Sequence, residues 1–169
     1  MKNFKIIYLI LFLIITSCSS SDDLDENNAE DITGVWNLSD YSSQIFWDEV
    51  GEYIKRTGDN IYYTIEFKEN PKVINLTGEI NYLEEELIIG EIINSSGIIN
   101  GELGEGHHTQ EWEIVNGNLI TKSSFFIGGT LTEWDEVTEI IELTSNSMTL
   151  RIDHVGSQQR GETILKYTR

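Results

Sequence analysis

The chain has 169 residues, with 29 acidic against 11 basic side chains and a net charge of −18. This balance argues against nucleic acid as a partner, because binding a phosphate backbone depends on neutralisation by Lys and Arg. It also disfavours lying flat on an anionic membrane surface. A single proline, fourteen glycines and many Ile, Thr, Tyr and Trp residues favour a β-rich fold.

The first residues have the pattern of an export signal. Lys2 and Lys5 precede an uninterrupted apolar run over residues 6–15. That run is shorter than the roughly 20 residues that a membrane-spanning helix needs, and a polar, acidic segment follows it. We therefore predict a cleaved signal peptide over residues 1–17, which takes no part in the fold.

The end of this segment, Ile15-Thr16-Ser17-Cys18, resembles the lipobox of bacterial lipoproteins. The resemblance implies cleavage just before Cys18, acylation of its sulfur and of the new amine, and stable anchoring by several acyl chains. Cys18 is the only cysteine, so it has no disulfide partner within the chain. An ordinary signal peptide that ends near a cysteine is the alternative.

The residue after Cys18 bears on localisation. Ser19 stands where lipoproteins kept at the inner membrane tend to carry Asp. The resemblance therefore implies the outer membrane, on its periplasmic face or at the cell surface. The acidic run that follows looks like the export signals of some surface-displayed lipoproteins. Outer-membrane lipid, held through the acyl chains on Cys18, is then the expected partner.

Residues 18–31 are predicted to form the lipidated cysteine and a flexible acidic tether, because large apolar residues are nearly lacking there. Asp23, Asp25 and Asn27 have the opening spacing of a calcium loop. The glycine and the final glutamate that such a loop requires are missing. A solvated linker is the better interpretation.

The remaining residues, 32–169, are expected to form one domain of short strands. Gly34, Trp36 and Leu38 share one face at period two. Residues 42–56 have no clear period and could form a short amphipathic helix, an irregular strand or a lid. A turn is predicted at 57–60. The clearest strand follows, with its inward side chains at Ile61, Tyr63, Ile65 and Phe67.

Turn signals divide the rest of the domain. Residues 69–72 are predicted to be a tight connection, and Ile74, Leu76, Ile80 and Tyr82 then share a face. Residues 87–99 contain Gly90 and the polar run 94–97, which predict a hairpin. A glycine-rich loop covers 101–108, and Trp112 and Ile114 alternate with glutamates. Asn116-Gly117 predicts a type I′ hairpin, Gly128-Gly129 a break, and 137–169 a final meander with turns at 145–146 and 156–161.

Eight to ten short strands at hairpin spacing predict an antiparallel sheet that either closes into a barrel or splits into a sandwich. Closure removes the exposed edges that invite pairing with neighbours. We therefore favour an all-β, antiparallel up-and-down barrel of about eight strands.

Four motifs, in this order along the chain, resemble the lipocalin-like domains carried by bacterial lipoproteins. They are Gly34-Val-Trp36; Trp112-Glu-Ile114-Val-Asn-Gly117-Asn-Leu119; Leu143-Thr144 with Met148-Thr-Leu150; and Tyr167-Thr-Arg169. The resemblance implies a barrel that is closed at one end by Gly34, Trp36 and Arg169, with the arginine packed across the tryptophan ring. The chain departs from lipocalins in lacking their disulfides and in its aromatic segment at 42–55.

No sequence motif for catalysis or phosphate binding is present, so we expect neither enzymatic activity, nor a cofactor, nor a metal site. His107 and His108 are adjacent, which on an extended chain points them to opposite sides and favours a solvated loop over a metal site. His154 has inward parity near a strand end and is interpreted as a rim or core histidine. Glu139 shares parity with Ile141 and could anchor a ligand headgroup, unless a bulge turns it outward.

Two functions follow from this interpretation. In the first, the barrel binds a small apolar or amphipathic molecule between the side chains Trp36, Tyr63, Ile65, Phe67, Trp112, Glu139, Met148 and Leu150. In the second, these side chains simply fill the interior. The domain would then be an interaction module that contacts a partner protein or glycan through Phe46-Trp47 or through its acidic loops. The oligomeric state is left open.

Overall fold

The computed structural model describes residues 32–100, 110–127 and 130–169. The predicted signal peptide, Cys18 with its tether, the pair His107-His108 and the break at Gly128-Gly129 lie outside the described residues. The described residues form nine strands. They are β1 (Gly34–Trp47), β2 (Glu52–Glu69), β3 (Lys72–Ile88), β4 (Glu91–Asn100), β5 (Gln110–Val115), β6 (Asn118–Ile127), β7 (Thr130–Leu143), β8 (Ser147–Asp153) and β9 (Gln159–Thr168).

The strands close into an antiparallel eight-stranded barrel, in the order β2-β1-β9-β8-β7-β6-β5-β3 and back to β2. The predicted all-β antiparallel barrel of about eight strands is therefore confirmed. β3 is long enough to change neighbours along its length. It pairs with β5 at residues 73 and 74 and with β4 over residues 79–88. β4 is thus a ninth strand outside the ring.

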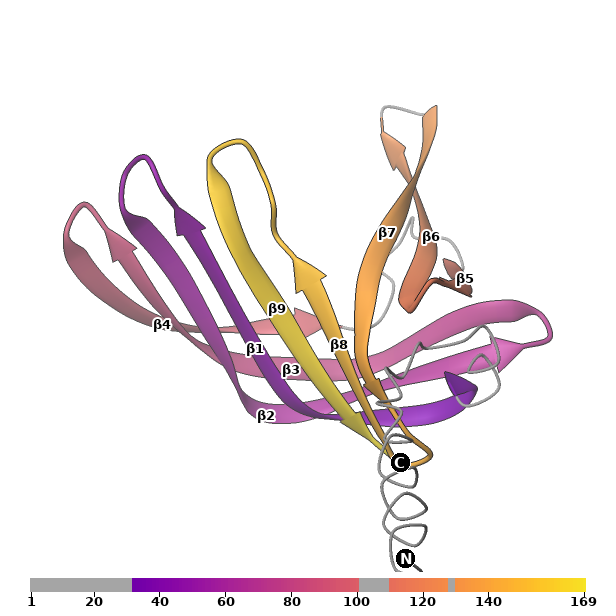
Figure 1. Cartoon of the computed structure of the whole chain (residues 1–169). Coiled ribbons are helices and arrows are strands. Elements are labelled where there is room, and N and C mark those ends of the chain that lie inside the picture. The colour runs from indigo at the N-terminus through magenta and orange to yellow at the C-terminus, as the bar shows by residue number, and fades with distance from the viewer. Residues whose placement is uncertain (1–31, 101–109, 128–129) are drawn as a thin grey trace, which may run out of the picture.

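The two ends of the barrel differ. Figure 1 shows the tips of the β1–β2, β3–β4 and β8–β9 hairpins spreading apart on one side, which we call the open end. The C-terminus lies at the opposite, closed end, together with the short turn between β7 and β8.

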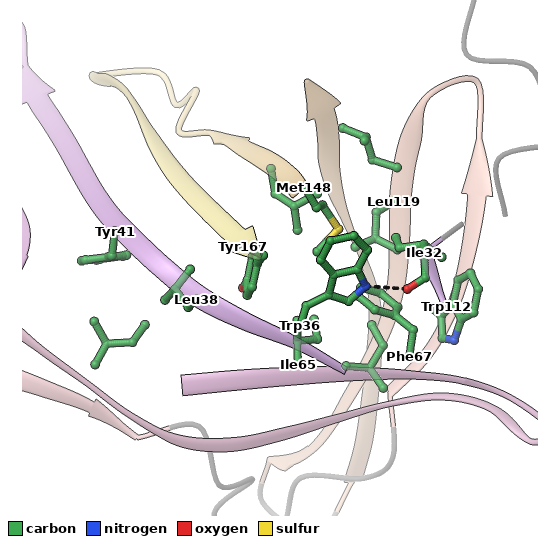
Figure 2. Packing of buried hydrophobic residues seen from close by; sticks show 14 residues of the cluster. Ile32, Trp36, Leu38, Tyr41, Ile65, Phe67, Trp112, Leu119, Met148 and Tyr167 are labelled. Atoms are coloured by element: carbon green, nitrogen blue, oxygen red, sulfur yellow. Dashed lines mark hydrogen bonds between the residues drawn. The ribbon is translucent and has the colours of Figure 1, made fainter. Parts of the chain in front are cut away.

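The hydrophobic core lies toward the closed end and follows the predicted alternation. Trp36 and Leu38 are buried, whereas Val35, which immediately precedes Trp36, is half exposed. The buried cluster is Ile32, Trp36, Leu38, Tyr41, Ile65, Phe67, Ile74, Ile80, Trp112, Leu119, Ile140, Met148, Leu150 and Tyr167. Figure 2 shows Trp36 at its centre, with Met148, Leu119 and Phe67 around the indole. The Phe67 and Trp112 rings meet edge to face, with centroids 5.4 Å apart.

The short turns agree with the sequence at two places. β2 ends at Glu69 and β3 begins at Lys72, as the predicted tight connection requires. Asn116 and Gly117 both have positive φ, 52° and 75°, which is the backbone of the predicted type I′ hairpin between β5 and β6.

The structure resolves one open assignment and corrects one local prediction. Residues 42–56 adopt the strand alternative and form no helix, because β1 and β2 continue through them and turn at 48–51. Residues 57–60 are not a turn but part of β2, where the pairing with β3 shifts register between Gly58 and Ile61. Turn-type residues fit there because a bulge also needs an irregular backbone.

The hairpin predicted within residues 87–99 is present as the β3–β4 hairpin. Its turn is at Ile89-Gly90, whose φ angles are 51° and 79°, while the polar residues 94–97 lie inside β4. Gly90 was the local signal for this turn, whereas Ile89 gave none, because a β-branched residue rarely adopts positive φ.

Gly78 shows why one glycine is needed inside a strand. Its φ is +89°, and a Cβ there would lie 1.7 Å from the carbonyl oxygen of Tyr62 on β2. The close approach of β2 and β3 therefore requires glycine at this position.

Candidate functional site

The side chains predicted to line a ligand cavity are mostly the core itself. Six of them are at most 6% exposed: Trp36, Ile65, Phe67, Trp112, Met148 and Leu150. Tyr63 is partly buried and packs against the same cluster. They come from four different strands, β1, β2, β5 and β8, and pack into one buried cluster that fills the closed half of the barrel.

Glu139 is the exception and faces outward. Its carboxylate forms an ion pair with Arg151 on β8, and its side chain is 44% exposed. The pairing of β7 with β8 shifts register between Ile140 and Glu142, so buried Ile140 points inward on one side of the shift and Leu143 on the other. The possible role of Glu139 as an inward anchor is therefore wrong, and the bulge is the reason.

The closed end carries the contact that the motifs imply. The Arg169 guanidinium carbon lies 3.9 Å from the centroid of the Trp36 ring, and the guanidinium donates to the carbonyl of Thr33. The Trp36 indole N–H donates to the carbonyl of Ile32 at 2.7 Å, drawn as a dashed line in Figure 2. The backbone N–H of Arg169 donates to Asn146, which holds the chain end in place.

Above the core, the inner wall of the barrel becomes polar. The Thr163 hydroxyl on β9 donates to Ser43 on β1 at 2.8 Å, and both residues are buried. Because that hydroxyl hydrogen is used, Nε2 of His154, 2.7 Å away, donates to Thr163. His154 is half-buried at the end of this chain of hydrogen bonds, which agrees with its interpretation as a rim histidine.

A second polar group lies beside the first, on β2, β3 and β4. Nε of Arg56 donates to Glu84 at 2.6 Å, and the Ser95 hydroxyl donates to the other oxygen of that carboxylate. The bond from Arg56 holds the pKa of Glu84 below its usual value. The guanidinium also lies 5.2 Å from the centroid of the Tyr82 ring.

The opposite wall contributes one acidic group, Glu136 on β7. It pairs with Thr121, which is buried, so both side chains lie on the inner side of the sheet. Burial raises the pKa of Tyr63 to about 12, and the charge of Glu136 adds to that effect. The inward carboxylate of β7 is thus Glu136 and not Glu139.

Sequence reasoning missed the inward positions of Ser43 and Arg56 because register shifts reverse the parity of β1 and β2. In β1 the inward positions change from even to odd between Leu38 and Tyr41, across the shift in pairing with β9. In β2 the inward positions are odd at Ile61 and Tyr63 but even before Gly58, so the shift there turns Arg56 inward as well. The turn-type residues 57–60 were the one available signal.

The open end holds an apolar groove of about 310 Å³, which we call the rim groove. Its lining comes from the tips of β1–β2 and β3–β4 and from the β8–β9 loop: Trp47, Glu49, Val50, Glu52, Tyr53, Ile54, Leu87, Ile88 and Gln158. Gln158 donates to Glu49 at 3.1 Å, and the backbone N–H of Ile89 donates to Glu52 at 3.0 Å. These two bonds tie the three tips together around the groove.

The aromatic segment Phe46-Trp47 is divided between the two faces. Trp47 lines the rim groove, whereas Phe46 packs on the other side against Tyr53, with ring centroids 6.1 Å apart. Arg160 lies 5.7 Å from the Phe46 ring and bonds Asp48 at 2.8 Å. The tip of the β1–β2 hairpin is thereby fixed to β9.

Two negative findings concern the described ranges. Within 32–100, 110–127 and 130–169, no group of three or more His, Cys, Asp or Glu side chains is placed to hold a metal ion. The same ranges contain no helix that is both long and apolar enough to cross a membrane.

The comparisons with known proteins give no family. No protein-family model matches the chain, and a search of the curated proteins returns no match. The class of protein that the fold defines is therefore a closed antiparallel eight-stranded barrel with a filled closed end and a polar, grooved open end.

Proposed function

We propose that this chain is an exported lipoprotein, anchored through Cys18, whose lipocalin-like barrel binds a small amphipathic molecule at its open end. The observation that carries the binding role is the rim groove, an apolar concavity bordered by acidic groups above an interior that is already filled. The anchor rests on the signal pattern and the lipobox resemblance of residues 1–18.

The size of the rim groove fits a small ligand. Its volume of about 310 Å³ is at the lower end of the range of roughly 300–1,000 Å³ that ligand pockets occupy. Trp47, Ile54 and Ile88 supply the apolar contact area, and the polar groups are few. Burial of an apolar ligand body against these side chains would drive binding.

The negative charges around the rim groove restrict the class of ligand that it can bind. Glu49 and Glu52 border the groove, and the chain as a whole carries −18. An anionic headgroup is repelled there, while a neutral or cationic one is tolerated. The proposed ligand is therefore a neutral or cationic amphiphile rather than a fatty acid or a phosphate ester.

Binding is tested with N-phenyl-1-naphthylamine, a small neutral fluorescent probe. We expect saturable enhancement of its fluorescence by the protein, and loss of at least about tenfold in affinity in the variant Trp47→Ala, since tenfold corresponds to about 1.4 kcal/mol. Trp134→Ala is the matched control, because Trp134 is also partly exposed but lies on β7. Equal binding by the two variants, or none by the wild type, would refute the rim groove as the site.

The anchor has its own test, which does not depend on any ligand. The Cys18→Ser variant should move from the membrane fraction to the soluble fraction, because the acyl chains would have no attachment point. Continued membrane association of that variant would contradict the lipobox interpretation while leaving the groove untouched.

The interaction module remains a second candidate because of one observation. Several aliphatic side chains around the β3–β4 hairpin are exposed, among them Ile89 at 88% and Ile98 at 62%. Exposed apolar surface of this kind is typical of protein contact sites. The tip of this hairpin also lines the rim groove through Leu87 and Ile88, so the two functions would share this end of the molecule.

A further inference from the structure

β4 has one partner within the described part of the chain. It pairs with β3 over its whole length, from Glu91 to Asn100, and no described strand pairs with its other edge over residues 91–99. Natural edge strands are usually protected against further pairing by Lys, Pro, bulges or short length. β4 is ten residues long and carries a single charge, Glu91.

Several exposed side chains of β4 are apolar, whereas a protected edge strand carries charged side chains at such positions. Ile92 and Ile98 are 60% and 62% exposed, and Ile93 is 47% exposed. Partner residues across a ladder lie on the same face of the sheet. Ile92 pairs with Leu87 and Ile98 with Asn81, whereas Ile99 packs into the core. Ile92 and Ile98 therefore both lie on the outer face.

Ile92 and Ile98, the two most exposed isoleucines of β4, lie three residues to either side of Ser95. Counting outward from it gives Asn94 and Ser96, then Ile93 and Gly97, then Ile92 and Ile98. We propose that β4 is a dimerisation edge, which pairs antiparallel with β4 of a second copy of this chain about a two-fold axis that passes midway between the two Ser95 residues.

The register follows from the symmetry. A two-fold axis perpendicular to the sheet keeps both outer faces on the same side, so opposed residues must have the same parity and one residue must lie opposite its own copy. Centring on Ser95 sets Ile92 of each copy opposite Ile98 of the other. The two most exposed isoleucines of the strand then cover each other, with Leu87 beside them on β3.

The same arrangement fits the inner face. Ile93 would lie opposite Gly97, the position of β4 with no side chain of its own. A Cβ on Gly97 would lie 2.3 Å from the Tyr82 hydroxyl, so the tyrosine ring already occupies that space. Ile93 of the second copy would therefore pack beside Tyr82, which adds apolar contact without displacing anything.

Charge does not prevent this dimer even though each copy is strongly acidic. The acidic run Glu84 to Glu86 is on β3, one strand away from the edge. At about 4.8 Å per strand, the two runs would be roughly 14 Å apart across β3, β4 and their symmetry mates. That exceeds the Debye length of about 8 Å at physiological ionic strength, so most of the repulsion is screened.

Disulfide trapping tests both the pairing and its register. In a chain carrying Cys18→Ser, the variant Ser95→Cys introduces the only cysteine, directly opposite itself across the proposed axis. Opposed residues have Cβ atoms about 4.5–5.5 Å apart, close enough for a disulfide. We expect rapid, concentration-dependent formation of a covalent dimer under mild oxidation.

Two exposed serines are matched controls. Ser96→Cys moves the thiol by one residue, to a position whose own copy is diagonal rather than opposite, and Ser145→Cys places it in the β7–β8 turn at the closed end. Both should cross-link at least tenfold more slowly than Ser95→Cys. Equal rates in all three variants would mean chance collision, and faster cross-linking of Ser96→Cys would mean another register. Either result overturns the proposal.

A second measurement does not depend on a new cysteine. The unlipidated wild type should show a concentration-dependent dimer in sedimentation, and the double variant Ile92→Lys, Ile98→Lys should be monomeric, because four lysines would then face one another across the edge. Val137→Lys, an equally exposed apolar position on β7, should leave the dimer unchanged. A wild type that is monomeric at all concentrations, or a dimer that survives the double variant, would exclude β4 as the contact.

Discussion

The pair Trp36 and Arg169 at the closed end gives the sharpest test of how the barrel is held together. Replacing Arg169 with methionine keeps an aliphatic cover over the indole but removes the cation and its hydrogen bond to Thr33. Replacing Trp36 with phenylalanine keeps an aromatic ring but removes the hydrogen bond to Ile32. The double variant measures how far the two residues act together.

The magnitudes follow from the contacts. A cation–π contact contributes about 0.5–1 kcal/mol at exposed sites and up to about 2 kcal/mol when desolvated. Here the ring is fully buried while the arginine is exposed, so we expect Arg169→Met to lower the free energy of unfolding by about 1.5 kcal/mol. Trp36→Phe should cost about 2–3 kcal/mol, from the lost hydrogen bond and the space left in a packed core.

Equilibrium unfolding in urea, followed by the fluorescence of the remaining tryptophans, measures these costs. With a slope of about 1–3 kcal/mol per molar urea, Arg169→Met should shift the midpoint by roughly 0.5–1.5 M. The coupling energy from the four proteins should be about 0.5–1 kcal/mol. Additivity within about 0.3 kcal/mol would show that the cation over the ring contributes nothing, and the reasoning would be refuted.

Three further predictions concern the strand interior and the polar wall. Glu84→Gln should cost about 1 kcal/mol near neutral pH, because it removes the charged partner of Arg56. The folded pKa of Glu84 is lowered, so its contribution is present above the ordinary value of 4.5 and is lost as the pH falls below it; urea midpoints at pH 7 and pH 3 measure this. Gly78→Ala should lower the free energy of unfolding by at least about 3 kcal/mol or prevent folding. Gly51 also has positive φ but has open space around it, so Gly51→Ala should cost only about 1–2 kcal/mol. Thermal unfolding measures both costs. The folded pKa of Tyr63 is raised from 10 to about 12. Its contribution to stability is therefore full below pH 10 and is lost as the pH rises toward 12. Stability measurements from pH 8 to 12 on the wild type and on Tyr63→Phe would reveal this loss.

Each of these has an outcome that contradicts it. A midpoint difference between wild type and Glu84→Gln that is the same at both pH values would mean that the ion pair makes no pH-dependent contribution. Equal costs at Gly78 and Gly51 would show that backbone strain, and not the approach of the neighbouring strand, decides the effect. A Tyr63→Phe variant that loses stability above pH 10 as steeply as the wild type would assign that loss to other groups.

The sequence pattern predicted the strands well where one face is buried along an unbroken ladder. The alternation at Trp36 and Leu38, at Ile65 and Phe67, and at Met148 and Leu150 is borne out by their burial. Side chains on a strand point to alternate faces, so a buried face leaves a period-two signal that needs no neighbour to interpret it. The export signal and the anchor on Cys18 rest on local pattern alone and remain predictions.

Only the tertiary structure decided where that alternation reverses. The register shifts near Leu38, Gly58 and Ile140 depend on how β1, β2 and β7 pair with neighbours far away in the sequence. A bulge changes the face of every residue beyond it. For this reason Arg56 was not expected inside the barrel, and the outward position of Glu139 could not be settled from parity.

The sequence also left open whether the barrel interior contains a cavity. From the sequence, large inward side chains could equally line a cavity or fill it, because local pattern gives the direction of a side chain but not the distance to the opposite wall. The closure of eight strands fixes that distance, and Trp36, Phe67, Trp112 and Met148 meet across it. The sequence thus determined which residues face inward along each regular stretch. The barrel geometry determined that they form a plug at the closed end and leave the open end as the candidate site.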